Sequence, residues 1–167
     1  MSNRPYYFAY GSNMAAERLS ARVPSARFVC IGELIGHSLK FHKPSKDGSA
    51  KCDAASTGNS ADRVYGAVFS ILESELLRLD TFEGRGFGYD RKSVLLITES
   101  LGNIEATTYL ATKCDSSLLP FDWYKEHVVR GAKAIGLPES YVALIEAVAC
   151  VVDHDIKRRA TELAIYG

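Results

Sequence analysis

The chain has 167 residues, of which 47% are hydrophobic and 24% are charged. This size and composition predict one globular domain over residues 1–167, with a sizeable core. Its 20 Lys and Arg residues balance 20 Asp and Glu residues, so no excess charge favours nucleic acid or an anionic membrane as a partner. We therefore expect neither of these partners, and we expect a small polar molecule as the ligand.

The N-terminus lacks a charged-then-apolar leader, and no apolar run approaches the ~18 residues of a membrane span. We therefore expect a cytoplasmic protein. The cysteines are widely spaced and form no C-x-x-C pair, which argues against a zinc knuckle or a dithiol redox centre. We expect reduced, mostly structural thiols at Cys30, Cys52, Cys114 and Cys150.

The first predicted element is an aromatic strand at residues 6–10. It breaks into Gly11, Ser12 and Asn13, and a helix-forming stretch follows at residues 14–21. A tight turn between a strand and a helix leaves backbone N–H groups without partners. Such a turn can bind an anion or an oxygen atom that gains negative charge during a reaction.

Short β-rich runs continue as far as residue 112, interrupted by helices at residues 14–21 and 73–82. The segment at residues 43–62 is rich in Ser, Gly, Lys, Asp and Ala and shows no period, so we expect a long loop there. Such a loop either flanks a binding site or is a surface excursion without a role. The predicted strands are 6–10, 27–35, 38–42, 63–71, 89–98 and 104–112.

The pattern becomes helical after Pro120. Asp122 is the predicted N-cap of a first helix, which stops at Gly136. Two further helices are expected at residues 139–148 and 153–165. Together these elements predict an α+β protein with a helical C-terminal tail.

A second candidate for chemistry is the segment L-D-T-F-E-G at residues 79–84. Apolar residues recur every three or four positions before it, which predicts a helix with one buried face. Glu83 lies at the end of this helix, just before Gly84. Both the negative end of the helix dipole and burial would raise the pKa of Glu83 toward the range useful for proton transfer. The alternative is an ordinary solvated glutamate at a helix end.

Other candidate catalytic or metal-binding residues have weaker support. Ser12 is not in a G-x-S-x-G pattern, so a hydrogen-bonding or capping role is favoured over a nucleophile. His37 and His42 would point to opposite faces of one strand, so we expect no metal site. His127 and His154 are isolated on helices and are expected at the surface or as capping residues.

An ordered set of motifs in this chain resembles the gamma-glutamylcyclotransferase family. The helical tail resembles the gamma-glutamylcyclotransferases proper rather than the shorter gamma-glutamylamine cyclotransferases. The motifs are Y-G-S-N at residues 10–13, L-D-x-x-E-G at 79–84, Tyr89 opening the next strand, Tyr109-Leu110 on the following one, Trp123-Tyr124-Lys125, and G-L-P at 136–138.

The resemblance implies a small mixed β-barrel flanked by helices, with a barrel core at about residues 5–112, the helical tail at 121–167 and a cavity on one side. It also implies an enzyme that needs no cofactor. Members of the family convert a gamma-glutamyl amino acid to 5-oxoproline and release the free amino acid. In this acyl transfer, the α-amino group of the substrate attacks the side-chain amide of the same molecule. The cyclisation belongs to glutathione and gamma-glutamyl peptide metabolism.

By the same resemblance, Glu83 is the general base and then the general acid. The turn would donate backbone hydrogen bonds to the glutamyl carboxylate or to the amide oxygen, and both options stay open. The tyrosines would help to hold the substrate, and for Tyr109 and Tyr124 packing in the core is an equal alternative. The substrate-binding positions implied are Tyr10, Gly11, Ser12, Asn13, Tyr89, Tyr109 and Tyr124.

Two other functions remain open. The first is a related enzyme that acts on gamma-glutamylamines or on a gamma-glutamyl-protected biosynthetic intermediate. The second is a non-catalytic module that binds a small anion or a gamma-glutamyl group, although such a module has no need of a carboxylate at Glu83. A homodimer formed through the tail helices also stays open.

Overall fold

The computed structural model describes residues 2–167, and a closed barrel with the strand order β1-β5-β2-β6-β7 lies at its centre. β1 closes the barrel because it pairs antiparallel with β5 on one side and parallel with β7 on the other. The strands are β1 (Tyr6–Ala9), β2 (Arg27–Ile35), β3 (His37–Pro44), β4 (Ala50–Ser56), β5 (Arg63–Ser70), β6 (Tyr89–Thr98) and β7 (Gly102–Ala111).

The barrel is filled by apolar side chains from several of its strands. Phe8 of β1, Val68 of β5 and Leu96 of β6 are fully buried. They meet around Gly32 of β2, where a Cβ atom would lie 3.0 Å from Val68 and 3.2 Å from Leu96. Full burial of such a side chain contributes about 1.5–3 kcal/mol. This core holds the ends of β1 and β7 in place for the site described below.

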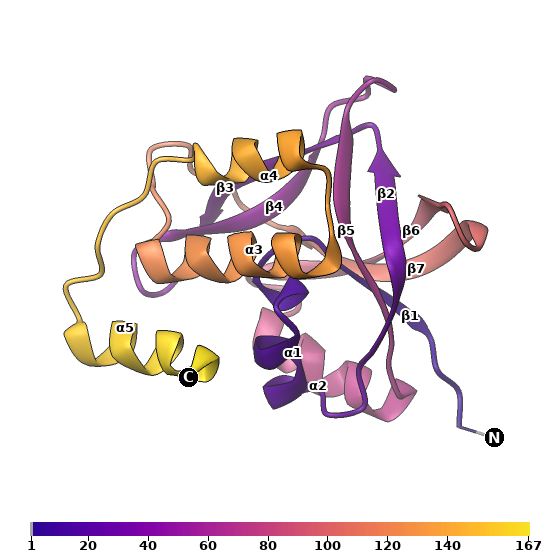
Figure 1. The fold of residues 1–167 in the computed structure, drawn as a ribbon, viewed down its shortest axis with the longest axis horizontal. Coiled ribbons are helices and arrows are strands. Elements are labelled where there is room, and N and C mark those ends of the chain that lie inside the picture. The colour runs from indigo at the N-terminus through magenta and orange to yellow at the C-terminus, as the bar shows by residue number, and fades with distance from the viewer. Residues whose placement is uncertain (1) are drawn as a thin grey trace.

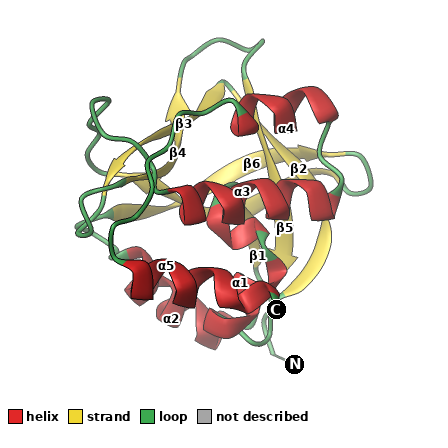
Figure 2. Cartoon of the chain, turned by 60° about the vertical axis from the view of Figure 1, so that its left-hand side comes forward, coloured by secondary structure: helices red, strands yellow, loops and turns green. Residues whose placement is uncertain are grey.

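Helices cover the barrel and the turn that follows β1. In Figure 1, α3 crosses the middle of the molecule between α4 above it and α1, α2 and α5 below it, and Figure 2 shows strands behind α3 and α4. The α+β prediction, with a barrel and a helical C-terminal region, is confirmed. The helices are α1 (Ala16–Arg22), α2 (Glu73–Glu83), α3 (Asp122–Ile135), α4 (Glu139–Glu146) and α5 (Ile156–Leu163), with 3-10 turns η1 (Ser12–Met14) and η2 (Ala164–Tyr166).

The long loop predicted at residues 43–62 is wrong. β4 lies within it and pairs antiparallel with β3 to form a separate two-stranded sheet. Consecutive residues Cys52, Asp53 and Ala54 are all buried. A strand that is buried on both faces loses the alternation of polar and apolar residues by which a strand is recognised in a sequence.

The ends of the tail helices also differ from the prediction. Asp122 is the first residue of α3 rather than its N-cap, and its carboxylate instead pairs with Arg159 at 2.7 Å. The third tail helix is shorter than the predicted 153–165, because Asp155 caps α5 by accepting a hydrogen bond from the backbone N–H of Arg158. The tail is thus held by ion pairs and caps that local propensity does not specify.

Predictions for single residues had mixed outcomes. His127 was expected at the surface or at a helix cap, but it is fully buried in α3 and hydrogen-bonded to Glu162 and Tyr166. His154 is exposed, as expected.

All the cysteines are free thiols. Within residues 2–167, no helix is both long enough and apolar enough to span a membrane.

Gly131 allows α3 to pack directly behind the turn after β1. A Cβ atom at this position would lie 2.5 Å from the backbone nitrogen of Ala15 and 2.6 Å from the carbonyl carbon of Met14. Both neighbours are backbone atoms, which cannot rotate away as a flexible side chain could. The absence of a side chain at Gly131 therefore sets how closely α3 supports the turn.

We expect Gly131→Ala to lower the free energy of unfolding by about 1–3 kcal/mol, because the added methyl group overpacks this contact. Helix propensity alone predicts the opposite sign, since Ala in a helix is favoured over Gly by about 1 kcal/mol. Urea unfolding of the two proteins measures the difference. The exposed position Ala134 offers a control in the same helix, where Ala134→Gly should show only the propensity effect. A Gly131→Ala protein more stable than the native one would refute the close contact.

Candidate active site

A cavity of about 320 Å³, part of it open to solvent, lies between the turn after β1 and the end of α2. Strands β1, β4, β6 and β7 and helix α3 contribute the rest of its lining. Every residue that the sequence predicts for the site lines this cavity: Tyr10, Gly11, Ser12, Asn13, Glu83, Tyr89, Tyr109 and Tyr124.

The turn forms one wall of the cavity. The backbone N–H groups of Ser12 and Asn13 donate no hydrogen bond to any residue from 2 to 167, so they remain available to a ligand. Gly11 lets β4 come close, because a Cβ atom there would lie 3.0 Å from the Cβ of Cys52 and 3.4 Å from the hydroxyl oxygen of Tyr124. Ser12 is not a helix cap.

The hydroxyl oxygen of Ser12 instead accepts a hydrogen bond of 3.1 Å from the guanidinium of Arg18. This contact agrees with the hydrogen-bonding role that the sequence favours over a nucleophile. It also holds the first turn of α1 against the cavity wall.

Glu83 faces the turn from the last residue of α2, and Gly84 ends the helix in the left-handed conformation with φ 63°. Only 14% of the Glu83 side chain is exposed. Its Oε1 atom accepts a hydrogen bond of 3.1 Å from Asn13 Nδ2, and Arg22 Nη1 lies 3.8 Å from the same oxygen. The other oxygen, Oε2, has no hydrogen-bond partner among the described residues, so a ligand can reach it.

Burial raises the pKa of Glu83, and the positive charges of Arg22, Arg18 and Lys43 together with the hydrogen bond from Asn13 oppose that rise. Burial favours the protonated form of this carboxyl group and the nearby cations favour its ionised form, so the group can both accept and release a proton. The direction agrees with the expectation from the sequence. Its largest cause is burial.

Three of the tyrosines direct their hydroxyl hydrogens into the protein. Tyr10 donates to the carbonyl oxygen of Tyr109, and Tyr89 donates to the carbonyl oxygen of Cys52 at 2.6 Å. Tyr109 donates to the carboxylate of Asp80 at 2.6 Å. The aromatic rings therefore form fixed walls, and their hydroxyl hydrogens are not free to bind a ligand.

Tyr7 and Tyr124 differ, because their hydroxyl oxygens accept hydrogen bonds. Tyr124 accepts from the backbone N–H of Cys52 at 2.9 Å, and Tyr7 accepts from Asn13 Nδ2 at 3.0 Å. Tyr7 keeps its own hydrogen for another acceptor. Burial raises the pKa of Tyr7, so its hydroxyl stays protonated. The same Asn13 nitrogen also contacts Glu83, which places Tyr7 beside that carboxylate.

Tyr7 was not predicted from the sequence as a residue of the site. An aromatic strand that leads into the turn was the available signal, but alternation does not say which face of a barrel strand reaches a cavity. The role of Asp80 was not predicted either: its second carboxylate oxygen pairs with Arg85 at 3.2 Å and Arg91 at 3.1 Å. Within the L-D-x-x-E-G motif, the Asp thus positions Tyr109 while the Glu reaches the cavity.

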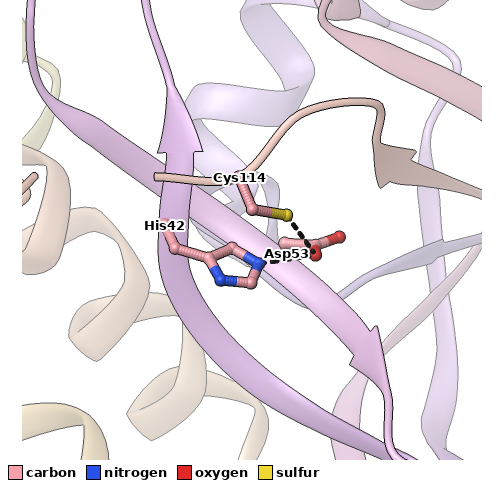
Figure 3. A group of neighbouring side chains, drawn as sticks. All are labelled: His42, Asp53 and Cys114. Atoms are coloured by element: carbon pink, nitrogen blue, oxygen red, sulfur yellow. Dashed lines mark hydrogen bonds and ion pairs between the residues drawn. The ribbon is translucent and has the colours of Figure 1, made fainter. Parts of the chain in front are cut away.

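A separate group of His42, Asp53 and Cys114 has its ligand atoms within 4.8 Å of one another, as Figure 3 shows. His42 Nε2 lies 2.8 Å from Asp53 Oδ2, and Asp53 Oδ1 accepts from the backbone N–H of Ala111 at 2.9 Å. Both carboxylate oxygens of Asp53 therefore already have hydrogen-bond partners. These hydrogen bonds account for the group as a link between the β3-β4 sheet and the end of β7.

The sequence model of the AIG2-like family matches residues 63–145 of the chain. That match includes Glu83, Tyr89, Tyr109 and Tyr124. The chain belongs to the gamma-glutamylcyclotransferase family, because it is 34% identical over 146 residues to gamma-glutamylcyclotransferase of Homo sapiens, covering 85% of this chain and 77% of that protein.

Other relatives agree with this assignment. Gamma-glutamylcyclotransferase of Bos taurus is 32% identical over 160 residues, which cover 93% of this chain and 83% of that protein. A solved structure of a gamma-glutamyl cyclotransferase superposes with a TM-score of 0.83 at 29% identity, covering 96% of this chain and 99% of the other. The barrel fold implied by the sequence resemblance is thereby confirmed.

Proposed function

We propose that this protein cyclises a gamma-glutamyl amino acid to 5-oxoproline and releases the free amino acid. The observation that carries the proposal is the contact between the turn and the carboxylate, in which Asn13 Nδ2 lies 3.1 Å from Glu83 Oε1 across one cavity. The names of the curated relatives describe the same activity in those proteins. Glu83 is the only ionisable carboxylate among the residues that line the cavity.

Glu83 carries the proton transfers of this proposal. The α-amino group of the substrate is mostly protonated near neutral pH and must lose a proton before its nitrogen can form a bond to the side-chain carbonyl carbon. Glu83 Oε2 accepts that proton and returns it to the departing nitrogen as the carbon–nitrogen bond of the original amide breaks, so the carboxylate ends in its starting form. The attacking nitrogen loses its second proton to solvent as the lactam forms, and the released amine takes up one proton from solvent.

Two sets of hydrogen-bond donors serve the two acceptor groups of the substrate. The amide oxygen gains negative charge next to the nitrogen that Glu83 protonates, so the hydroxyl of Tyr7 beside Glu83 is our candidate donor for that oxygen. The N–H groups of Ser12 and Asn13 are then left for the glutamyl carboxylate. The fixed rings of Tyr10 and Tyr89 would fold the flexible chain into its reactive shape.

A test of this proposal is a mass-spectrometric assay for 5-oxoproline with purified protein and a panel of gamma-glutamyl amino acids and gamma-glutamylamines. We expect 5-oxoproline and the free amino acid to form in equal amounts, and only with native protein present. If a correctly folded protein binds these compounds but forms no product from any of them, the non-catalytic binding module replaces this proposal.

We expect Arg22→Met to shift the acid limb of the pH profile of kcat/KM to higher pH. The charge of Arg22 opposes the rise in the pKa of Glu83 caused by burial, so its removal raises that pKa further. A general base acts only when ionised, and activity is therefore lost as pH falls through its pKa. The exposed cation Arg27 provides a control variant, Arg27→Met, which should leave the profile unchanged. An acid limb that stays in place in Arg22→Met would argue against Glu83 as the base.

A further inference from the structure

Lys43 is a half-buried cation of β3. Its ammonium nitrogen lies 4.9 Å from the centre of the Tyr89 ring, which lines the cavity. Within residues 2–167, Lys43 makes no ion pair and no side-chain hydrogen bond. By contrast, Lys51 of β4 pairs with Asp47 at 2.9 Å. A half-buried ammonium without a partner is available for an anionic ligand.

The ammonium of Lys43 also lies against the segment that follows Glu83. A Cβ atom at Gly88 would lie 3.0 Å from Lys43 Nζ and 3.2 Å from the carbonyl oxygen of Glu83. Burial lowers the pKa of Lys43, and the carboxylate of Glu83 is the strongest influence in the opposite direction. Lys43 and Glu83 therefore act on each other electrostatically at one end of the cavity.

The proposed substrate brings a second carboxylate to this end. In a gamma-glutamyl amino acid, the α-carbon of the departing amino acid joins the amide nitrogen to a carboxylate, so the nitrogen that Glu83 protonates lies two bonds from the carboxylate carbon. That carboxylate would repel Glu83 unless a cation stood between or beside them. Arg22 is already engaged by Glu83, by Asn13 at 3.4 Å and by the Phe82 ring at 5.0 Å.

We propose that Lys43 binds the α-carboxylate of the departing amino acid and so makes the protein selective for gamma-glutamyl amino acids over gamma-glutamylamines. This inference rests on the proposed function and assigns the part of its site that recognises the leaving group. A gamma-glutamylamine lacks this carboxylate and gains nothing from Lys43.

Two substrates that differ only in this carboxylate test the inference: gamma-glutamyl-L-alanine and gamma-glutamylethylamine. A hydrogen bond to a charged group is worth about 1.5–3 kcal/mol, so Lys43→Met should lower kcat/KM for the alanine compound about 10- to 100-fold, mainly through KM. Because the charge of Lys43 also lowers the pKa of Glu83, the comparison is made at a pH above the acid limb of both proteins, where turnover of the ethylamine compound should change by less than about twofold. Lys43→Arg, which keeps the charge, should retain most of the preference for the alanine compound.

The control is Lys40→Met, an exposed lysine on the same strand, which should change neither substrate. A second measurement uses the native protein alone, whose preference for the alanine compound should fall as salt shortens the screening length from ~10 Å at 0.1 M to ~3 Å at 1 M. Equal losses on both substrates in Lys43→Met, together with a salt-independent preference, would overturn the inference. A native protein that cyclises neither compound would instead overturn the proposed function, and this inference with it.

Discussion

Glu83→Gln is expected to lower kcat by about 10²–10⁴-fold with little change in substrate affinity. The glutamine keeps the size of the side chain, and its carbonyl oxygen can still accept the hydrogen bond that Asn13 Nδ2 donates to Glu83 Oε1 at 3.1 Å. It cannot accept or return a proton at the reacting nitrogen. Steady-state kinetics would measure the loss of turnover, and calorimetry would measure binding of the substrate to the variant.

Glu73→Gln is the matched control, because Glu73 is an exposed glutamate in the first turn of the same helix α2. It should keep native activity. If Glu83→Gln retained more than about a tenth of the native kcat, general acid-base catalysis by this carboxylate would be ruled out as the main contribution.

Tyr7→Phe is expected to lower kcat by about 10²–10³-fold, the loss typical of removing one donor to a developing oxyanion. The hydroxyl of Tyr7 accepts from Asn13 at 3.0 Å and keeps its own hydrogen for the substrate. KM should change little, because the bond strengthens as the amide oxygen gains charge. Kinetics on the substrate found by the 5-oxoproline assay would measure both constants.

Tyr6→Phe is the control for this variant. Tyr6 precedes Tyr7 on β1, is only half-buried, and its hydroxyl makes no hydrogen bond with the residues that the structure describes. The pH profile separates two roles for Tyr7: a donor to the substrate leaves the acid limb in place, whereas a residue that only positions Glu83 through Asn13 moves it. Similar kcat values for Tyr6→Phe and Tyr7→Phe would remove Tyr7 from the reaction.

Strands with one buried face were predictable from the sequence. The bounds of β2 and β6 agree with the prediction, because both combine β-branched or aromatic residues with flanking turn residues. β4 was not predictable, since its small residues are buried on both faces. Closure of the barrel by the parallel contact of Tyr7 with Thr107 joins segments far apart in the chain, and no local pattern contains that information.

The functional site likewise combines features that the sequence predicts with features that it does not. The turn and Glu83 were recognisable as local motifs with a chemical rationale, and the structure brings them to one cavity. Contacts between residues far apart in the chain were not predictable: Arg22 reaches Glu83 from the end of α1, and Tyr109 of β7 donates its hydroxyl hydrogen to Asp80 of α2. Hydrogen-bond direction at each tyrosine decides which hydroxyl can serve a substrate, and spacing along the chain does not encode that direction.

The most direct test of the central claim follows the atoms of the reaction. Gamma-glutamyl-L-alanine labelled with ¹⁵N at its α-amino group would be incubated with native protein in H₂¹⁸O, with Glu83→Gln as the control. Intramolecular attack predicts 5-oxoproline that keeps the ¹⁵N and carries no ¹⁸O, together with an equal amount of alanine, and only with the native protein. Glutamate carrying ¹⁸O would show hydrolysis instead, and that result would contradict the cyclotransferase account.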